Sequence, residues 1–277
     1  MKVKLPDYHL HTTFCKHAEG SMESYVERAI ELGLDEIGFS DHMPVMPEPQ
    51  FCMGYDQLPI YIDRVRELQI RYESQISVRL GCEMDMVTDR LDEIRDIIEK
   101  NSFDYIIGSI HYLGGWPFDQ KQYSHVFETD SIDRIYERFF NTIIEAAKTG
   151  LYDITGHIDN IKRMGYRPAN DMSGLYEHVA EVLKSMDCTV EVNTSGIDSA
   201  AREPYPSLEF LRILCAKGVP VTVGSDSHNA ESVGRYYDRV SEYIKEAGYN
   251  HIAYFKGRKR ILKPIDGTNQ NKEVNDE

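Results

Sequence analysis

Short apolar segments rich in β-branched and aromatic residues alternate along this chain with longer segments of helical periodicity. The pattern predicts strands over residues 5–11, 36–40, 76–82, 105–109, 152–155, 189–193 and 220–224. It predicts helices over residues 22–32, 60–74, 89–100, 132–149, 174–186 and 207–216, then a helix near 232–246 and a short strand near 252–255. Strands separated by helices form right-handed βαβ units, so the sequence predicts a parallel sheet.

The number of these units favours a closed barrel over an open, doubly wound sheet. A doubly wound sheet more often carries a Gly-rich phosphate-binding turn after its first strand, and neither a GxGxxG nor a P-loop pattern occurs here. The 277 residues, 41% of them hydrophobic, are sufficient for one large domain. We expect that domain to occupy residues 1–265 and the polar tail, residues 266–277, to be disordered.

Charge and cysteine content restrict the classes of partner and compartment. The chain has 31 basic and 46 acidic residues, a net charge of −15, which disfavours binding to nucleic acid or to an anionic membrane surface. Its five cysteines form no CxxC pair, which favours a reducing compartment. No signal peptide or membrane span is evident in the sequence, and we therefore expect a cytoplasmic protein.

Metal-binding residue types follow nearly every predicted strand. In an extended segment alternate side chains share a face, so His9 and His11 point the same way, and His17 follows in the next loop. The carboxyl ends of barrel strands share one rim, on which the active sites of this architecture are built. The candidate metal ligands are His9, His11, His17, His42, Glu83, His111, His157, Asp226 and His228.

The recurrence of these residues matters more than any one of them. A single histidine at a strand end is more often structural than a ligand, but core packing does not explain a series of them on one rim. Imidazole and carboxylate together suit zinc, iron or manganese, and a carboxylate can bridge two ions and so activate water for hydrolysis. His125, His178 and His251 lack this placement and are predicted to be structural or exposed.

The motifs together resemble the polymerase-and-histidinol-phosphatase (PHP) superfamily. They are His-Leu-His with a trailing His17, Ser40-Asp41-His42, Gly108-Ser109-Ile110-His111, Gly156-His157 and Ser225-Asp226-Ser227-His228. The segments 104–111, with the following Gly-Trp-Pro-Phe-Asp loop, and 191–196 are most similar to the histidinol-phosphate phosphatase branch. The resemblance extends from about Asp7 to His228.

The resemblance implies a distorted TIM-like (β/α)7 barrel with a metal site of three divalent ions at the C-terminal ends of its strands. His9, His11, Glu83 and Asp226 would bind the first ion, and Glu83 would bridge to a second, held also by His111 and His157. His17, His42 and His228 would hold the third. The implied activity converts L-histidinol phosphate to L-histidinol and phosphate in histidine biosynthesis, by attack of a metal-bridging hydroxide. Asp226 or His228 are the candidates that would protonate the leaving group.

A site for a small phosphate ester also needs hydrogen-bond donors to the phosphate oxygens, in addition to the metals. Arg163 and Lys162 shortly after His157, Ser195 after the sixth strand, and Arg202 in the next loop are the candidates. The family often has a basic residue directly after Asn-Thr-Ser-Gly, whereas this chain has Ile197-Asp198 there. Loops 43–59 and 112–131 leave the same rim, and their aromatic residues or Asp119 and Asp198 are candidates for recognising the rest of the substrate.

Other interpretations stay open from the sequence. A PHP enzyme acting on another sugar or nucleotide phosphate fits the same ligands, while the acidic charge weakens an exonuclease. A non-catalytic metal-binding module would be expected to lack ligands, and none of the nine positions is missing. An amidohydrolase barrel also begins with HxH, but it gives no clear purpose to His17, His42 and His228.

Overall fold

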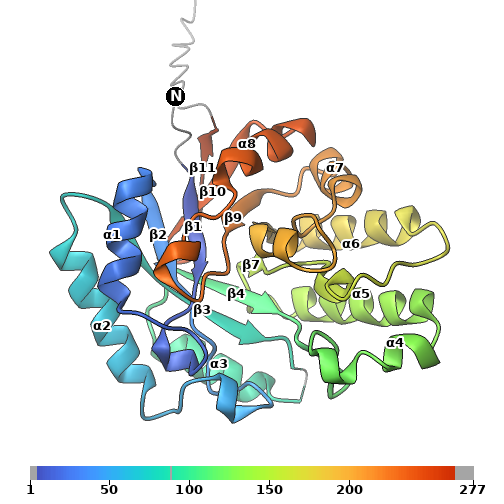
Figure 1. Cartoon of the computed structure of the whole chain (residues 1–277), viewed down its shortest axis with the longest axis horizontal. Coiled ribbons are helices and arrows are strands. Elements are labelled where there is room, and N and C mark those ends of the chain that lie inside the picture. Colours follow the sequence, from blue (N-terminus) through green and yellow to red (C-terminus); the bar gives the residue numbers. More distant parts are fainter. Residues whose placement is uncertain (1–4, 88, 266–277) are drawn as a thin grey trace, which may run out of the picture.

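Seven parallel strands form one sheet at the centre of the molecule (Figure 1). The computed structural model describes residues 5–87 and 89–265. Neighbouring strands follow chain order, with every pair parallel, as the alternation of strands and helices predicted. The strands are β1 (Pro6–Leu10), β2 (Glu36–Phe39), β3 (Ser77–Asp85), β4 (Tyr105–Ser109), β7 (Ile154–Thr155), β8 (Thr189–Asn193) and β9 (Val221–Gly224).

The first and last strands meet just beyond their carboxyl ends and nearly close the sheet into a barrel. The His11 amide donates to the Ser227 carbonyl at 2.8 Å, and the Ser227 amide donates to the His9 carbonyl at 3.0 Å. Asp7, fully buried, accepts hydrogen bonds from the amides of Ser225 and Gly234 across the same seam. The predicted TIM-like barrel is confirmed, and this seam brings His9 and His11 beside the segment that carries Asp226.

Helices surround the barrel on its outside (Figure 1). The predicted ends of the first helix are confirmed: Ser21 accepts a hydrogen bond from the Ser24 amide, and Gly33 ends the helix with a φ of 75°. The helices that cover the sheet are α1 (Met22–Leu32), α2 (Leu58–Arg71), α3 (Leu91–Lys100), α5 (Ile132–Lys148), α6 (Ser173–Ser185), α7 (Leu208–Ala216) and α8 (Tyr237–Glu246).

The structure differs most from the prediction in three segments. Helix α8 begins at Tyr237, five residues later than predicted, because Gly234 and Tyr236 adopt left-handed conformations that interrupt a helix. The last predicted strand is observed as β10 (His251–Lys256), and it pairs with a further strand, β11 (Lys259–Pro264), which was not predicted. The loop 112–131 contains the hairpin of β5 (Tyr112–Leu113) and β6 (Trp116–Pro117) and the short α4 (Val126–Thr129). The predicted tail 266–277 lies outside the described residues.

Aromatic side chains fill the amino-terminal half of the barrel interior. Tyr105, at the start of β4, is fully buried against the ring of Tyr8, with ring centroids 4.7 Å apart. Its ring occupies space that a Cβ atom at Gly38 or Gly81 would enter. The apolar filling ends there, and the interior at the carboxyl ends of the strands is left to polar side chains.

Candidate metal centre

The carboxylate of Glu83 lies at the middle of a histidine cluster at the carboxyl ends of the strands. Glu83 belongs to β3 and is 1% exposed. The nitrogens that face its oxygens are His42 Nδ1 at 3.0 Å, His157 Nε2 at 3.2 Å, His9 Nε2 at 3.3 Å, His11 Nε2 at 3.4 Å and His111 Nε2 at 3.7 Å. Five separate imidazoles therefore converge on one side chain.

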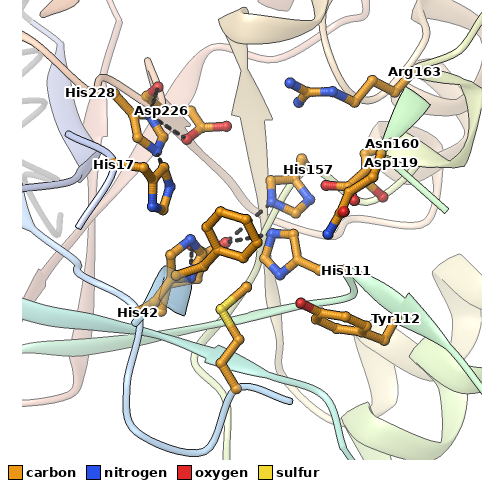
Figure 2. Close-up of a pocket in the computed structure, with 14 residues that line it drawn as sticks. His17, His42, His111, Tyr112, Asp119, His157, Asn160, Arg163, Asp226 and His228 are labelled. Carbon is orange, nitrogen blue, oxygen red and sulfur yellow. Dashed lines mark hydrogen bonds and ion pairs between the residues drawn. The ribbon is translucent and has the colours of Figure 1, made fainter. Parts of the chain in front are cut away.

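Asp226, His17 and His228 complete the cluster on one side. Asp226 Oδ1 lies 3.4 Å from His11 Nε2 and 3.7 Å from His228 Nδ1. His228 Nε2 and His17 Nε2 are 2.9 Å apart. Figure 2 shows His17 and His228 across the cavity from His111 and His157. The structure thus brings all the predicted ligands to one place.

Several overlapping groups of these residues have the spacing that a metal ion needs. In each group the ligand atoms lie within 4.8 Å of one another. The groups found among the described residues are His9–His11–Asp226, His9–Glu83–His157, His11–His42–Glu83, His42–Asp85–His111 and His11–Cys15–His228. Asp85 and Cys15 were not predicted from the sequence.

The hydrogen bonding of the cluster fits bound cations. His9 Nε2, both ring nitrogens of His11, His42 Nδ1 and Glu83 Oε2 are buried and make no hydrogen bond within the described residues. Buried polar atoms are normally paired, so such a concentration of unpaired ones indicates a missing partner. The carboxylate oxygen and one nitrogen of each uncharged imidazole offer lone pairs that zinc, iron or manganese accept as ligands.

The electrostatics at Glu83, Asp226, His11 and His228 favour the protonation states that bind metals. Burial opposes the charge of Glu83, but the imidazole of His9 and its neighbours hold the pKa of this carboxyl well below its usual range. The pKa of Asp226 is held low in the same way against its burial. Burial lowers the pKa of His11 well below its usual value and that of His228 to about 4, although Asp226 opposes the shift at His228. Near neutral pH these carboxylates are ionised and these imidazoles uncharged.

Partners behind the ligands hold their rings in place. Asp85 Oδ1 lies 3.0 Å from His111 Nδ1. The Cys15 carbonyl lies 2.8 Å from His17 Nδ1, so this nitrogen carries the proton and Nε2 keeps its lone pair. Asp85 follows Glu83 by two residues on β3, so the period of a strand places both on the interior face. That spacing was a signal in the sequence for Asp85, to which sequence reasoning gave no role.

A cavity of about 460 Å³ lies over the cluster and is lined by Tyr112, Asp119 and Arg163 in addition to seven of the nine predicted ligands. A second cavity of about 510 Å³ shares Asp119 and Arg163 with the first and extends to Ser195 and Arg235. The side chains of Arg163 and Asp119 make no hydrogen bond or ion pair with any other residue that the structure describes. Figure 2 shows both on the side of the cavity opposite His17 and His228.

Ser195 reaches the cluster, but two other predicted phosphate contacts do not. The Ser195 hydroxyl lies 3.2 Å from Asp226 Oδ2. Lys162 is 1% exposed, its Nζ lies 2.8 Å from Asp159 and 3.0 Å from Glu203, and it lines neither cavity. Arg202 is exposed and lines neither cavity. The structure therefore gives no support to the expectation that Lys162 and Arg202 bind phosphate, because Lys162 is paired with two carboxylates and Arg202 lies outside both cavities.

Arg235 is a residue of the site that sequence reasoning missed. Its guanidinium donates to the carbonyls of Ser225 at 2.8 Å and Asp226 at 2.7 Å and lies 3.2 Å from Asp198. Asp226 has a left-handed backbone, with a φ of 54°, and Arg235 holds that conformation from outside. Asp198 also accepts a hydrogen bond from Tyr236, so it is not free to bind a substrate amine as expected.

The rim loops contribute less aromatic surface than the sequence suggested. Phe51 lines the cavity, whereas Tyr55 is 53% exposed and bonded to Glu93. Trp116 packs edge to face against Phe127 inside its own loop. The two loops are joined by Glu48, which accepts hydrogen bonds from Tyr112 and Gln120 at 2.6 Å each. His125, His178 and His251 are exposed and outside the cluster, as predicted.

Two family models match the chain. The model of the PHP domain matches residues 7–195, and a model described as PHP-associated matches residues 211–247. The first contains most of the cluster and ends at Ser195. Among the described residues, no helix combines the length and apolar character needed to cross a membrane.

Relatives of the chain are similar over nearly their whole length. A probable histidinol-phosphatase of Deinococcus radiodurans is 32% identical over 94% of this chain and 99% of that protein. A histidinol-phosphatase of Bacillus subtilis is 27% identical over 85% of this chain and 98% of that protein. The crystal structure of histidinol phosphate phosphatase from Lactococcus lactis, complexed with zinc, L-histidinol and phosphate, has a TM-score of 0.80 at 24% identity, covering 93% and 99% of the two chains.

Proposed function

From the premise that this chain belongs to the PHP family, we infer that it is a histidinol-phosphatase. The enzyme hydrolyses L-histidinol phosphate to L-histidinol and phosphate, a step of histidine biosynthesis. Relatives named histidinol-phosphatase or probable histidinol-phosphatase match 85–94% of this chain. The observation in the structure that carries the inference is the buried carboxylate of Glu83 surrounded by imidazoles at the floor of a cavity that Arg163 lines.

We propose that the cluster holds three divalent ions. His9, His11, Glu83 and Asp226 would hold one, Glu83 with His111 and His157 a second, and His17, His42 and His228 a third. Zinc accompanies histidinol and phosphate in the related structure from Lactococcus lactis, and the imidazole-rich set of this chain suits zinc, with iron and manganese as alternatives. Bound ions would supply activation of water near neutral pH and neutralisation of the phosphate charge.

Phosphate binding and proton transfer are assigned to side chains of the protein. Arg163, free in the cavity, is placed to donate two hydrogen bonds to phosphate oxygens, and the Ser195 hydroxyl is a further donor beside Asp226. Asp226 and His228 line the cavity with Oδ1 and Nδ1 3.7 Å apart, and they are the candidates for accepting the proton of the attacking water. That proton is then available for the alkoxide oxygen of the departing histidinol.

Recognition of the amino alcohol is assigned to Asp119. Histidinol phosphate carries an ammonium group near its ester, and a carboxylate is the natural partner of that charge. Asp119 lines both cavities and has no ion pair among the described residues, whereas Asp198 is already bound by Arg235. We therefore propose Asp119 as the anchor of the substrate amine.

All five cysteines are free, which supports a reducing compartment such as the cytoplasm.

The activity is tested by phosphate release from a panel of esters. Protein purified without chelator is assayed with L-histidinol phosphate, a sugar phosphate and a nucleoside monophosphate. We expect kcat/KM for histidinol phosphate to exceed the others by roughly 100-fold, because a site that binds a specific charge rejects compounds lacking it. A preference for the sugar or nucleotide ester would show a different PHP phosphoesterase, and no release from any ester would indicate a non-catalytic module.

A further inference from the structure

Glu191 is a buried carboxylate that none of the proposed catalytic steps uses. It lies in the middle of β8 and is 1% exposed, inside the barrel and behind the metal cluster. Its ion pairs in the described part of the chain involve His9 alone, and neither Lys nor Arg approaches it there. A buried carboxylate without a cationic partner destabilises a fold, so packing alone gives no reason for this residue.

The two oxygens of Glu191 contact two different ligand strands. Oε1 lies 2.7 Å from His9 Nδ1 on β1. Oε2 accepts a hydrogen bond from the His157 amide, just after β7, at 2.8 Å, and a second from Asn193 Nδ2 at 3.0 Å. His157 has a φ of 22°, outside the usual range for a residue with a side chain, so its backbone must be held by neighbours.

The neighbouring strand makes space for this carboxylate. Gly224 ends β9, and a Cβ atom on it would overlap Glu191 Oε1 and press on the side chain of His9. The absence of a side chain at position 224 therefore lets Glu191 and His9 meet. The contact depends on residues from β1, β8 and β9 together.

The bond to His9 determines which nitrogen is left for a metal. An ionised carboxylate only accepts hydrogen bonds, so His9 Nδ1 must carry the proton. His9 Nε2 is then the nitrogen left to bind a metal, and it faces Glu83, 3.3 Å away, and Asp226. Removing a carboxylate that orients a metal-binding histidine in this way typically lowers metal affinity by about 10–100-fold.

We propose that Glu191 is a positioning residue that couples two ligand groups of the metal centre. Through Oε1 it fixes the Nδ1–H tautomer of His9, and through Oε2 it holds the strained main chain that presents His157 to Glu83. The groups His9–His11–Asp226 and His9–Glu83–His157 therefore depend on one side chain. The inference rests on the metal centre of the proposed function, but not on the identity of the substrate.

The variant Glu191→Gln tests the coupling with little change of shape. If the amide nitrogen faces His9, it donates to Nδ1 and favours the tautomer whose Nε2 carries a proton, which removes the ligand lone pair. If the amide nitrogen faces the other way, it opposes the donors of His157 and Asn193. In either orientation zinc should bind about 10–100-fold more weakly, as measured in the full chain by competition with a chromophoric chelator and without substrate.

The matched control is Glu36→Gln. Glu36 is also a buried glutamate of the barrel, 3% exposed, but it contacts the Tyr8 hydroxyl and Arg79 near the start of β2. Its variant should lose thermal stability and keep the zinc affinity of the wild type. A general effect of neutralising a buried glutamate would instead weaken zinc binding in both variants, and that result would overturn the proposal.

The remaining outcomes separate this inference from the proposed function. In the zinc-loaded wild type, ¹⁵N NMR of the histidine side chains should show a proton on His9 Nδ1, a measurement that needs no variant to fold. A proton on Nε2 would overturn the proposal, as would wild-type zinc affinity in Glu191→Gln. Wild-type protein that binds zinc but cleaves no histidinol phosphate would contradict the function and leave the role of Glu191 supported.

Discussion

Replacing Lys162 with methionine distinguishes a structural role from phosphate binding. Its Nζ lies 2.8 Å from Asp159, 3.0 Å from Glu203 and 3.0 Å from the Pro204 carbonyl, and the side chain is 1% exposed. Methionine fills a similar volume but leaves the buried Asp159 without its cation. Removing one partner of a buried ion pair costs about 3–5 kcal/mol of the free energy of unfolding.

That loss converts to a lower melting temperature. At about 2 °C per kcal/mol for a chain of this size, Tm should fall by roughly 6–10 °C. At a temperature well below either transition, KM for histidinol phosphate should stay within about threefold of the wild type, because the ammonium group does not reach the cavity. Calorimetry and steady-state phosphate release measure the two quantities on the same preparation.

The double variant Lys162→Met, Asp159→Asn is the control. It removes both charges, and the introduced asparagine side chain can still accept the hydrogen bond that the Ser207 amide donates to Asp159 in the wild type. Replacing both partners should therefore restore at least half of the lost stability. An unchanged Tm in the single variant together with a KM raised more than tenfold would refute the structural role and return Lys162 to the phosphate site.

Three further outcomes follow from the site. Arg163→Met should lower kcat/KM by about 10–150-fold, which corresponds to the loss of a charge-assisted hydrogen bond worth about 1.5–3 kcal/mol, and Arg163→Lys should lower it by less. The metal content of both variants, measured by mass spectrometry, should equal that of the wild type, and a loss of metal would show that Arg163 has another role. Asp119→Asn should raise KM for histidinol phosphate roughly tenfold and leave p-nitrophenyl phosphate, which has no amine, unaffected; equal effects on both would exclude an amine anchor. Burial opposes protonation of His111, but Asp85 and Glu83 raise its pKa to about 10 in the metal-free protein. Zinc must displace that proton, so at pH values below this pKa the zinc affinity should rise with pH, by up to about tenfold per pH unit for one proton. Calorimetry in two buffers should detect the released proton, and a zinc affinity independent of pH would contradict this prediction.

Sequence periodicity was sufficient to predict the barrel because strands and helices alternate along the chain. The same reasoning brought His9, His11, Glu83 and Asp226 to one rim, since the carboxyl ends of parallel strands share a face. Helix α8 was placed too early because the left-handed conformation of Tyr236 is set by tertiary contacts and leaves no mark in hydrophobic periodicity. Strand β11 was missed because most of its residues are exposed, so it lacks an apolar face.

Side-chain partners were less predictable than strand ends. Lys162 and Arg163 are adjacent in sequence, yet one is buried against carboxylates and the other is free in the cavity. The difference arises from the turn after β7, whose geometry residue types alone do not specify. Glu191 did leave a signal, because a charged residue inside the buried segment Thr189–Asn193 needs a partner, but its partner lies 182 residues away along the chain.

Titration of the metal-free enzyme with zinc tests the central claim most directly. Phosphate release from L-histidinol phosphate is measured as zinc is added to chelator-treated wild-type protein and to Glu83→Gln. Glu83 lies within 3.7 Å of five imidazoles, so its loss should disrupt the bridged sites. We predict no activity without metal, full activity in the wild type once its sites are filled, and almost none in Glu83→Gln at any zinc concentration. Activity in the metal-free protein, or full activity in Glu83→Gln, would contradict a metal centre organised around Glu83.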